Sequence, residues 1–180
     1  MVSYVALLRG IGPSNPNMRN ENLKRVFEDL GFKNVRTVIS SGNVLFETQS
    51  GDVKSLEALV EKTLPEQLDF RSTTIIRSKE ELEYLFNINP FKNIKDTPES
   101  KLNVTFLKNK PEIGVEFPFH AENQGFVVLG IFHGALCSIV NTKRSKTPVL
   151  MRWLEKEFGR EITTRTWKTV NRILQKLNET

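Results

Sequence analysis

An arginine and two glycines follow the first apolar run of the sequence. Residues 4–8 are apolar, and Arg9-Gly10-Ile11-Gly12 comes directly after them. Glycines let backbone amides approach a ligand closely, and the planar guanidinium of Arg9 can donate two parallel hydrogen bonds to a phosphate or a carboxylate. The pattern matches neither G-x-G-x-x-G nor the Walker A motif. We predict an anion-binding loop at Arg9 and Gly10. In the alternative interpretation, Arg9 binds a local carbonyl or carboxylate and the glycines form a turn.

A second polar segment, Ser40-Ser41-Gly42-Asn43, lies between two stretches that are typical of strands. It offers two hydroxyls, an amide and a glycine backbone. Strands that are adjacent in the sequence usually pair, so we expect this segment to lie near the first loop. Ser40, Ser41 and Asn43 are therefore candidate ligand-binding residues. Ordinary turn chemistry is the alternative.

Cations are concentrated near the C-terminus. Residues 141–180 contain ten Lys or Arg and four Glu, a net charge of +6, whereas residues 1–140 have a net charge of −1. Within a polar loop expected at 163–168, Thr166 can cap the last helix, which puts Arg165 and Lys168 near its positive end. Cations are unfavourable there unless an anion joins them. We predict ligand contacts from Arg165 and Lys168, with a solvated surface as the alternative.

Signals for metal binding or catalysis are weak in the sequence. The chain has no C-x-x-C, no H-E-x-x-H and no G-x-S-x-G motif, and its histidines, His120 and His133, are 13 residues apart. Cys137 lies inside an apolar strand pattern, so we expect it to be buried. No metal site and no cofactor are predicted, and no catalytic residue can be named.

The elements that must position these residues begin with an alternating pattern in the first half. Asn20 is the expected N-cap of a helix over 21–30 that Gly31 ends, and Asp52 is expected to begin a helix that ends or kinks at Pro65. These helices lie between strands expected at 2–9, 35–40, 44–48 and 70–77. The order β-α-β-β-α-β predicts a ferredoxin-like fold.

The second half repeats the element types in a different arrangement. We expect helices over 79–86, 148–158 and 167–177, and strands over 102–107, 115–119, 126–132 and 135–140. The fold class predicted is therefore α+β, with two ferredoxin-like lobes and antiparallel sheets. We place the lobes at residues 1–78 and 79–180 and expect one compact unit. A polar connection over 87–100 is long enough to be a lobe boundary or a mobile loop.

The composition of the 180 residues is that of a globular protein, with 38% hydrophobic and 26% charged residues. No apolar run reaches the ~18 residues that span a bilayer, and the first residues do not resemble a signal peptide. The single cysteine fits a reducing compartment. We expect a cytoplasmic protein without a membrane partner.

Four segments together resemble the bacterial family known as domain of unknown function 1697. They are Leu7–Ile11, Leu30–Phe32, Ile39–Val44 and Thr163–Trp167. The family pattern continues Arg-Gly-Ile with Asn-Val-Gly-Gly, where this chain has Gly-Pro-Ser-Asn at 12–15. The resemblance implies two ferredoxin-like α+β lobes. It implies no particular activity.

Three classes of function stay open. The leading hypothesis is a binding protein for a small anionic or phosphate-bearing ligand, held by strand-end loops. The second is an enzyme acting on such a ligand. The third is a nucleic-acid or protein interaction domain that uses the basic C-terminal helices; RNA binding in the manner of an RNA-recognition motif is disfavoured, because residues 42–47 contain one aromatic, Phe46, and do not match that motif.

Overall fold

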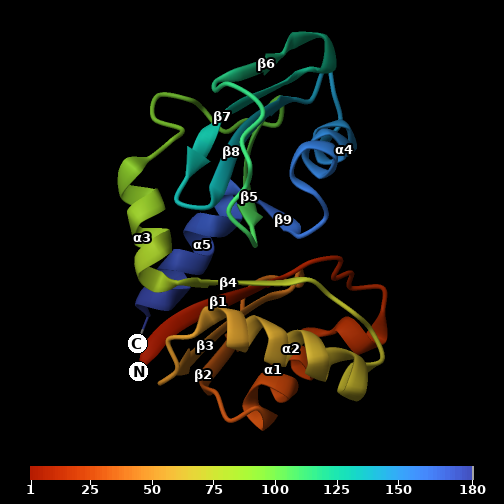
Figure 1. Cartoon of the computed structure of the whole chain (residues 1–180), viewed down its shortest axis with the longest axis vertical. Helices are drawn as coiled ribbons and strands as arrows, with labels where there is room; N and C mark the ends of the chain where they lie inside the picture. The colour runs from red at the N-terminus through yellow and green to blue at the C-terminus, as the bar shows by residue number, and fades with distance from the viewer. Residues whose placement is uncertain (180) are drawn as a thin grey trace. The chain divides into compact units, whose positions relative to one another are not determined.

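The computed structural model describes residues 1–179, apart from the side chain of Glu122. The chain divides into two compact units (Figure 1). Unit 1 contains Met1–Glu83 together with Arg172–Thr180, and unit 2 contains Tyr84–Asn171. The boundaries fall inside helices α3 (Lys79–Ile88) and α5 (Trp167–Asn178).

Unit 1 contains a four-stranded antiparallel sheet with strand order β2-β3-β1-β4. Its strands are β1 (Val2–Leu8), β2 (Lys33–Thr37), β3 (Asn43–Thr48) and β4 (Thr74–Ser78). The central strand β1 pairs on both sides, and its apolar residues Tyr4–Leu8 are buried. The predicted order of the first half is confirmed.

Helices α1 (Asn20–Asp29) and α2 (Val53–Leu68) cover one face of this sheet, as Figure 1 shows. Leu23 and Phe27 of α1 and Val60 of α2 share one core with Tyr4 and Phe46 of the strands. The predicted apolar stripes therefore point to the same side. A short 3-10 helix, η1 (Pro16–Met18), precedes α1.

Two of the predicted helix ends differ from the structure. Asn20 is the first residue of α1 rather than its cap, and Arg19 is the N-cap, without a side-chain hydrogen bond. The second helix does not end at Pro65, because α2 extends to Leu68. Burial of Leu64 and Leu68 on either side of the proline offsets the hydrogen bond that proline cannot donate. The predicted N-cap Asp52 is confirmed, with Oδ1 accepting from the N–H of Ser55 at 3.2 Å.

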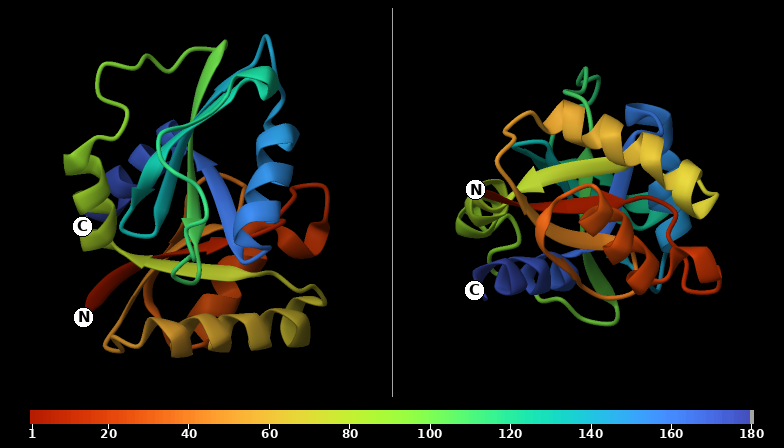
Figure 2. Two further views of the ribbon diagram at one scale, coloured as in Figure 1. Left: turned by 45° about the horizontal axis from the view of Figure 1, so that its top comes forward. Right: turned by 90° about the horizontal axis from the view of Figure 1, so that it is seen from below.

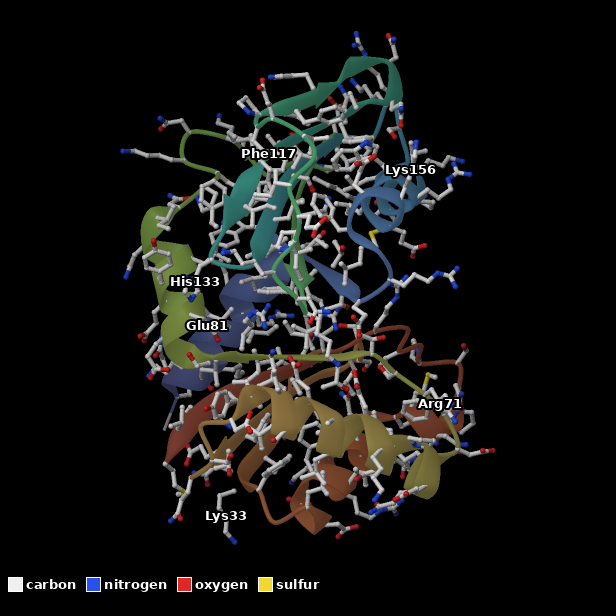
Figure 3. All side chains as sticks on the ribbon, in the orientation of Figure 1. Lys33, Arg71, Glu81, Phe117, His133 and Lys156 are labelled. Atoms are coloured by element: carbon white, nitrogen blue, oxygen red, sulfur yellow. The ribbon has the colours of Figure 1, made fainter. Side chains whose placement is uncertain are left out.

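The outer edge of β4 is covered by glutamates. The backbone N–H of Thr74 donates to Glu61 at 2.8 Å, and that of Ile76 donates to Glu57 at 2.9 Å. The next outward N–H, that of Ser78, donates to Glu81 at 2.7 Å, at the start of α3 (Figure 3). Three carboxylates thus occupy the donors that an edge strand would otherwise present to another chain.

Unit 2 contains a five-stranded antiparallel sheet with strand order β6-β7-β8-β5-β9. Its strands are β5 (Ser100–Leu107), β6 (Phe119–Ala121), β7 (Phe126–Phe132), β8 (Ala135–Asn141) and β9 (Ile162–Thr166). Without the edge strand β6, the order β7-β8-β5-β9 repeats the order β2-β3-β1-β4 of unit 1. The crossover helix after the first strand is replaced by residues 108–125, which contain β6 and the 3-10 turn η2 (Glu122–Gln124).

Helix α4 (Thr147–Phe158) supplies the second crossover and packs along the sheet of unit 2 (Figure 2, left). Leu150 and Leu154 share a core with Leu136, Val128 and Ile162 of the strands. The helix ends at Phe158, as predicted, and Gly159 caps it with φ 78°. The fold class is α+β with two antiparallel sheets in ferredoxin-like lobes. The division of the chain into lobes at residues 1–78 and 79–180 stays a prediction.

The predicted loop over 163–168 is wrong, because residues 162–166 form strand β9. Val104 of β5 pairs with Arg165, and Thr105 pairs with Thr164. Ile and Thr favour a pleated, half-buried surface, so this polar segment becomes a strand once β5 is beside it.

Candidate functional site

The backbone of Arg9 is fixed at the end of β1. Its N–H donates to the carbonyl of Thr73 at 2.9 Å, and its carbonyl accepts from Oγ of Ser72 at 2.7 Å. The side chain of Arg9 is partly exposed. Gly10 follows with φ 74° and is exposed, with open space where a side chain would be. This loop therefore has a fixed start and an accessible glycine backbone.

The second predicted segment lies against the first. The N–H of Leu8 donates to the carbonyl of Gly42 at 2.8 Å. A Cβ at position 42 would lie 2.6 Å from Cγ1 of Ile11 and 3.0 Å from the carbonyl oxygen of Leu8. Only glycine permits this approach, and its φ of 75° is also one that glycine adopts readily. The expectation that the two loops are neighbours is confirmed.

The side chains of the second segment divide into buried and accessible groups. Asn43 is buried, and its Nδ2 donates to the carbonyl of Val38 at 2.9 Å and to Oγ of Ser41 at 3.0 Å. Ser41 is partly exposed and Ser40 is exposed. Asn43 therefore holds the turn that presents the two hydroxyls, and a direct ligand contact from it stays a prediction.

Ile39, next to these serines, has φ 59°. A β-branched residue in the left-handed region is a true outlier and costs about 1–3 kcal/mol. Its side chain is 41% exposed, so burial does not explain the conformation. Sequence reasoning missed this residue, because nothing in its local pattern predicts a positive φ. Strain of this kind is often found at ligand sites.

Arg165 and Lys168 belong to unit 2. Nη1 of Arg165 donates to Oγ1 of Thr163 at 2.7 Å and to the carbonyl of Thr164 at 2.9 Å. The residue keeps some exposed surface, and burial of its guanidinium lowers the pKa of Arg165 to about 10, so the group is charged at neutral pH. These local acceptors therefore take up part of the hydrogen-bonding capacity of Arg165. Binding to local acceptors was the alternative interpretation given for Arg9.

The cap predicted for the last helix is present. The N–H of Thr169 donates to Oγ1 of Thr166 at 3.2 Å, at the start of α5. Lys168 is exposed beside this positive helix end. The structure thus brings Arg9 and Gly10 together with residues 40–43 in unit 1, and Arg165 together with the start of α5 in unit 2. A single site made of both groups stays a prediction.

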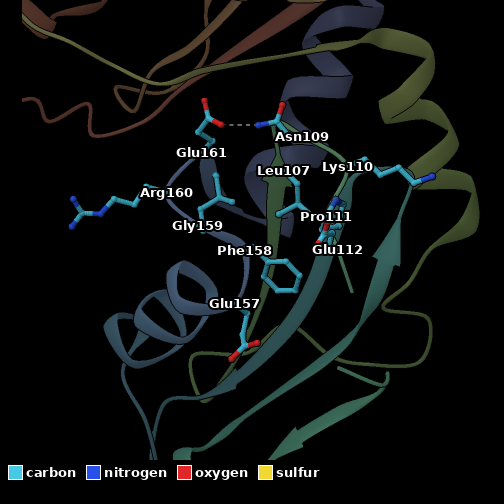
Figure 4. A pocket seen from close by; sticks show the side chains of 11 residues that line it. Leu107, Asn109, Lys110, Pro111, Glu112, Glu157, Phe158, Gly159, Arg160 and Glu161 are labelled. Atoms are coloured by element: carbon cyan, nitrogen blue, oxygen red, sulfur yellow. Dashed lines mark hydrogen bonds between the residues drawn. The ribbon is translucent and has the colours of Figure 1, made fainter. Parts of the chain in front are cut away.

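A cleft of about 250 Å³ in unit 2 was not predicted (Figure 4). It lies between the segment after β5 and the connection from α4 to β9, with Phe158 in its wall. Glu161 accepts a hydrogen bond from Nδ2 of Asn109 at 2.6 Å across it. Lys110 and Arg160 extend away from each other on its two sides, so their charges do not converge (Figure 4). This arrangement does not form an anion site.

The remaining residues considered for chemistry are not arranged for it. Cys137 is fully buried, and burial raises the pKa of its thiol to about 12, so it is protonated. His133 lies at the hairpin turn between β7 and β8 and stacks edge-on against Tyr84, with ring centres 5.5 Å apart (Figure 3). Among the residues described, no group of three or more His, Cys, Asp or Glu could hold a metal ion, and no helix is long and apolar enough to cross a membrane.

Residues 1–124 match the family model described as "Protein of unknown function (DUF1697)". The chain belongs to this family. The match includes all of β1–β5 and therefore both loops of the unit 1 site. The resemblance inferred from the sequence is confirmed.

The fold is similar to that of a conserved bacterial protein from Streptococcus pneumoniae. The two chains share 22% sequence identity, with a TM-score of 0.74, and the similarity covers 99% of each. At this identity the similarity establishes the α+β fold and nothing about activity. No curated protein matches the chain.

Proposed function

We propose that this member of the DUF1697 family binds a small anionic or phosphate-bearing ligand at the loops that follow β1 and precede β3. The proposed contacts are the guanidinium of Arg9, the backbone of Gly10 and the hydroxyls of Ser40 and Ser41, with Asn43 holding or touching the ligand. The observation that carries the proposal is the strained Ile39 in a turn packed against the Arg9 loop. Residues held in such strained conformations cluster at active sites, ligand clamps and switch regions.

We propose further that Arg165 and Lys168 bind an anionic ligand at the start of α5. A cation at a helix start is unfavourable by itself, and an anion would offset that cost. Lys168 is the second residue of α5, and Arg165 precedes the cap residue Thr166. Phosphate groups suit this set of donors because guanidinium groups and helix starts both recognise them. We expect this binding to take place in the cytoplasm.

Calorimetric titration with inorganic phosphate, pyrophosphate and citrate tests the proposal, with thermal shift as a second readout. We expect stabilisation that grows with ligand concentration, as mass action requires. Absence of binding to all three probes at millimolar concentration contradicts the proposal. Strongly salt-dependent binding to heparin without binding to the small probes would favour an interaction surface for a polyanion instead.

A double-mutant cycle tests whether Arg9 and Arg165 contact one ligand. Arg9→Ala and Arg165→Ala are measured singly and together, with pyrophosphate as the probe. Residues that contact one ligand give non-additive effects, whereas distant sites add within about 0.3–0.5 kcal/mol. Additive effects would separate Arg165 from the Arg9 site. Turnover of pyrophosphate to phosphate, followed by a colorimetric assay, would instead favour the enzyme alternative.

A further inference from the structure

The net positive charge of the protein belongs to unit 2. Residues 84–171 contain 13 Lys or Arg and 8 Asp or Glu, a net charge of +5, whereas unit 1 is neutral. A basic excess indicates an anionic partner when its cations gather on one surface. Four exposed cations do so along α4 and the loop before it, and we call them the α4 cation surface: Arg144, Lys146, Arg152 and Lys156.

Two of these cations are neighbours on the exposed side of α4. Arg152 and Lys156 are four residues apart, a spacing that places like charges side by side on a helix, where they repel each other. No ion pair is found for either residue within the part of the chain that the structure describes. Helix α4 thus keeps a repulsive pair that no described carboxylate offsets, and a bound anion would relieve the repulsion.

The other two cations lie at the start of α4. Lys146 is the N-cap and makes no side-chain capping hydrogen bond, and no acidic residue lies in the first turn. The loop before it is fixed, because the N–H of Arg144 donates to the carbonyl of Asn141 at 3.1 Å and Cβ of Arg144 lies 2.9 Å from where a Cβ at position 125 would be. Cations near the positive end of a helix are unfavourable by themselves, and a phosphate bound there would be stabilised by the cations and by the helix.

The acidic residues of α4 do not neutralise this surface. Oε2 of Glu155 is 3.8 Å from Nε of Arg160, which is not part of the surface. Glu157 lines the cleft beside Phe158 (Figure 4). The α4 cation surface therefore presents its charge to solvent.

The apolar side of α4 is occupied as well. Leu150 and Leu154 belong to the core of unit 2, and Trp153 stacks on Phe119 with ring centres 4.8 Å apart. A helix that binds a membrane surface needs a free apolar side, and single-stranded nucleic acids are bound by bases stacked on aromatic rings. Neither partner fits α4, whereas a duplex, which carries one negative charge per about 1.7 Å of its axis, needs only cations.

We propose that the α4 cation surface binds the phosphate backbone of a duplex nucleic acid. Contacts from Lys and Arg to phosphates position a protein on a duplex without reading its sequence. Helix α4 contains no Asn or Gln, the side chains that pair with adenine in the major groove, so binding does not depend on sequence. The surface is separate from the small-anion sites proposed above, and neither proposal requires the other.

Titration of the full chain with a short, fluorescently labelled DNA duplex tests the proposal, with anisotropy as the readout at NaCl concentrations from about 50 to 200 mM. We expect the logarithm of the binding constant to fall against the logarithm of the salt concentration with a slope of about −3.6, because each of four neutralised phosphates contributes about −0.9. A duplex of unrelated sequence should bind equally well. A slope shallower than about −1, or equal or tighter binding of the single strand or of phosphatidylserine vesicles, overturns the proposal.

Substitutions on α4 locate the binding surface. Arg152→Gln and Lys156→Gln should each make the salt slope shallower by about 1 and weaken all duplexes alike, whereas Arg152→Lys keeps the charge and should keep the slope. Lys62→Gln removes an exposed cation of unit 1 and is the matched control. Arg9→Ala should also leave duplex binding unchanged, which separates this surface from the small-anion site. Wild-type slopes in both glutamine variants of α4, or the same loss in Lys62→Gln, overturn the proposal.

Discussion

The carboxylate of Glu57, on α2, accepts a 2.9 Å hydrogen bond from the backbone N–H of Ile76, on the edge strand β4. Glu57 is only 3% exposed, so an ionisable side chain is buried where it accepts from a main-chain donor. Nearby, burial lowers the pKa of Arg77, while Glu81 and Glu57 act against that shift. The helix and the edge strand are thus joined by polar as well as apolar contacts.

Replacing Glu57 with Ala should lower the free energy of unfolding by about 1–3 kcal/mol, because it leaves the N–H of Ile76 buried without an acceptor. Glu57→Gln keeps an acceptor oxygen and should cost less. Glu66→Ala, on the exposed side of the same helix, is the matched control. Urea unfolding measures all three. Equal effects of Glu57→Ala and Glu66→Ala would show that the hydrogen bond does not stabilise the unit.

Two glycines with nearly the same φ allow the stability cost of backbone strain to be distinguished from that of close packing. Gly10 and Gly42 have φ 74° and 75°, but only position 42 has atoms within contact distance of a Cβ. Alanine in the left-handed conformation costs about 1–2 kcal/mol at either position. Gly42→Ala should cost clearly more, because its Cβ meets Ile11 and Leu8. Similar melting temperatures for the two variants would contradict the close approach of the loops.

Ile39→Asn should raise the free energy of unfolding by about 1 kcal/mol, because asparagine tolerates the left-handed region better than a β-branched residue. Ile113→Asn is the control, since Ile113 is exposed and has no positive φ. Thermal unfolding at equilibrium gives the comparison. A loss of stability at position 39 larger than at 113 would indicate that the Ile39 side chain makes a contact worth more than the strain.

Arg9→Ala should reduce the affinity for a phosphate probe by about tenfold or more, since hydrogen bonds to charged groups are worth about 1.5–3 kcal/mol. We expect the melting temperature without ligand to change little. Arg71→Ala, which removes an exposed arginine of the same unit (Figure 3), should affect neither. Strong destabilisation of the unliganded Arg9→Ala protein would instead assign a structural role to this guanidinium.

Cys137 should resist thiol reagents in the native protein, because its thiol is fully buried and its pKa is about 12. The unfolded thiol has a pKa of about 8.5, so the native state binds its proton more tightly and stability should fall as pH rises from about 8.5 to 12. The Cys137→Ala variant should lose less stability than the wild type as the pH rises through this range. If thiol reagents label Cys137 in the native protein at pH 8 as fast as in the urea-unfolded protein, the burial of this thiol is contradicted.

The sequence by itself determined most elements and the family. Apolar residues at helical spacing predicted α1 and α5, and Asp52, Gly31 and Gly159 predicted helix ends, because these signals act within one or two turns of the chain. The glycines and polar residues at 9–12 and 40–43 predicted two loops for the same reason. That the loops are neighbours was predicted from the tendency of strands close in the sequence to pair.

Tertiary structure decided the rest. The polar segment 162–166 became β9 only because β5, far away in the sequence, offers it a ladder of hydrogen bonds. The close approach of Gly42 to Leu8 follows from how two strand ends meet. The hydrogen bond from Arg36 to the carbonyl of Glu179 joins residues 143 positions apart. Local patterns report which face of an element is buried, whereas these features depend on which distant segments come to lie against it.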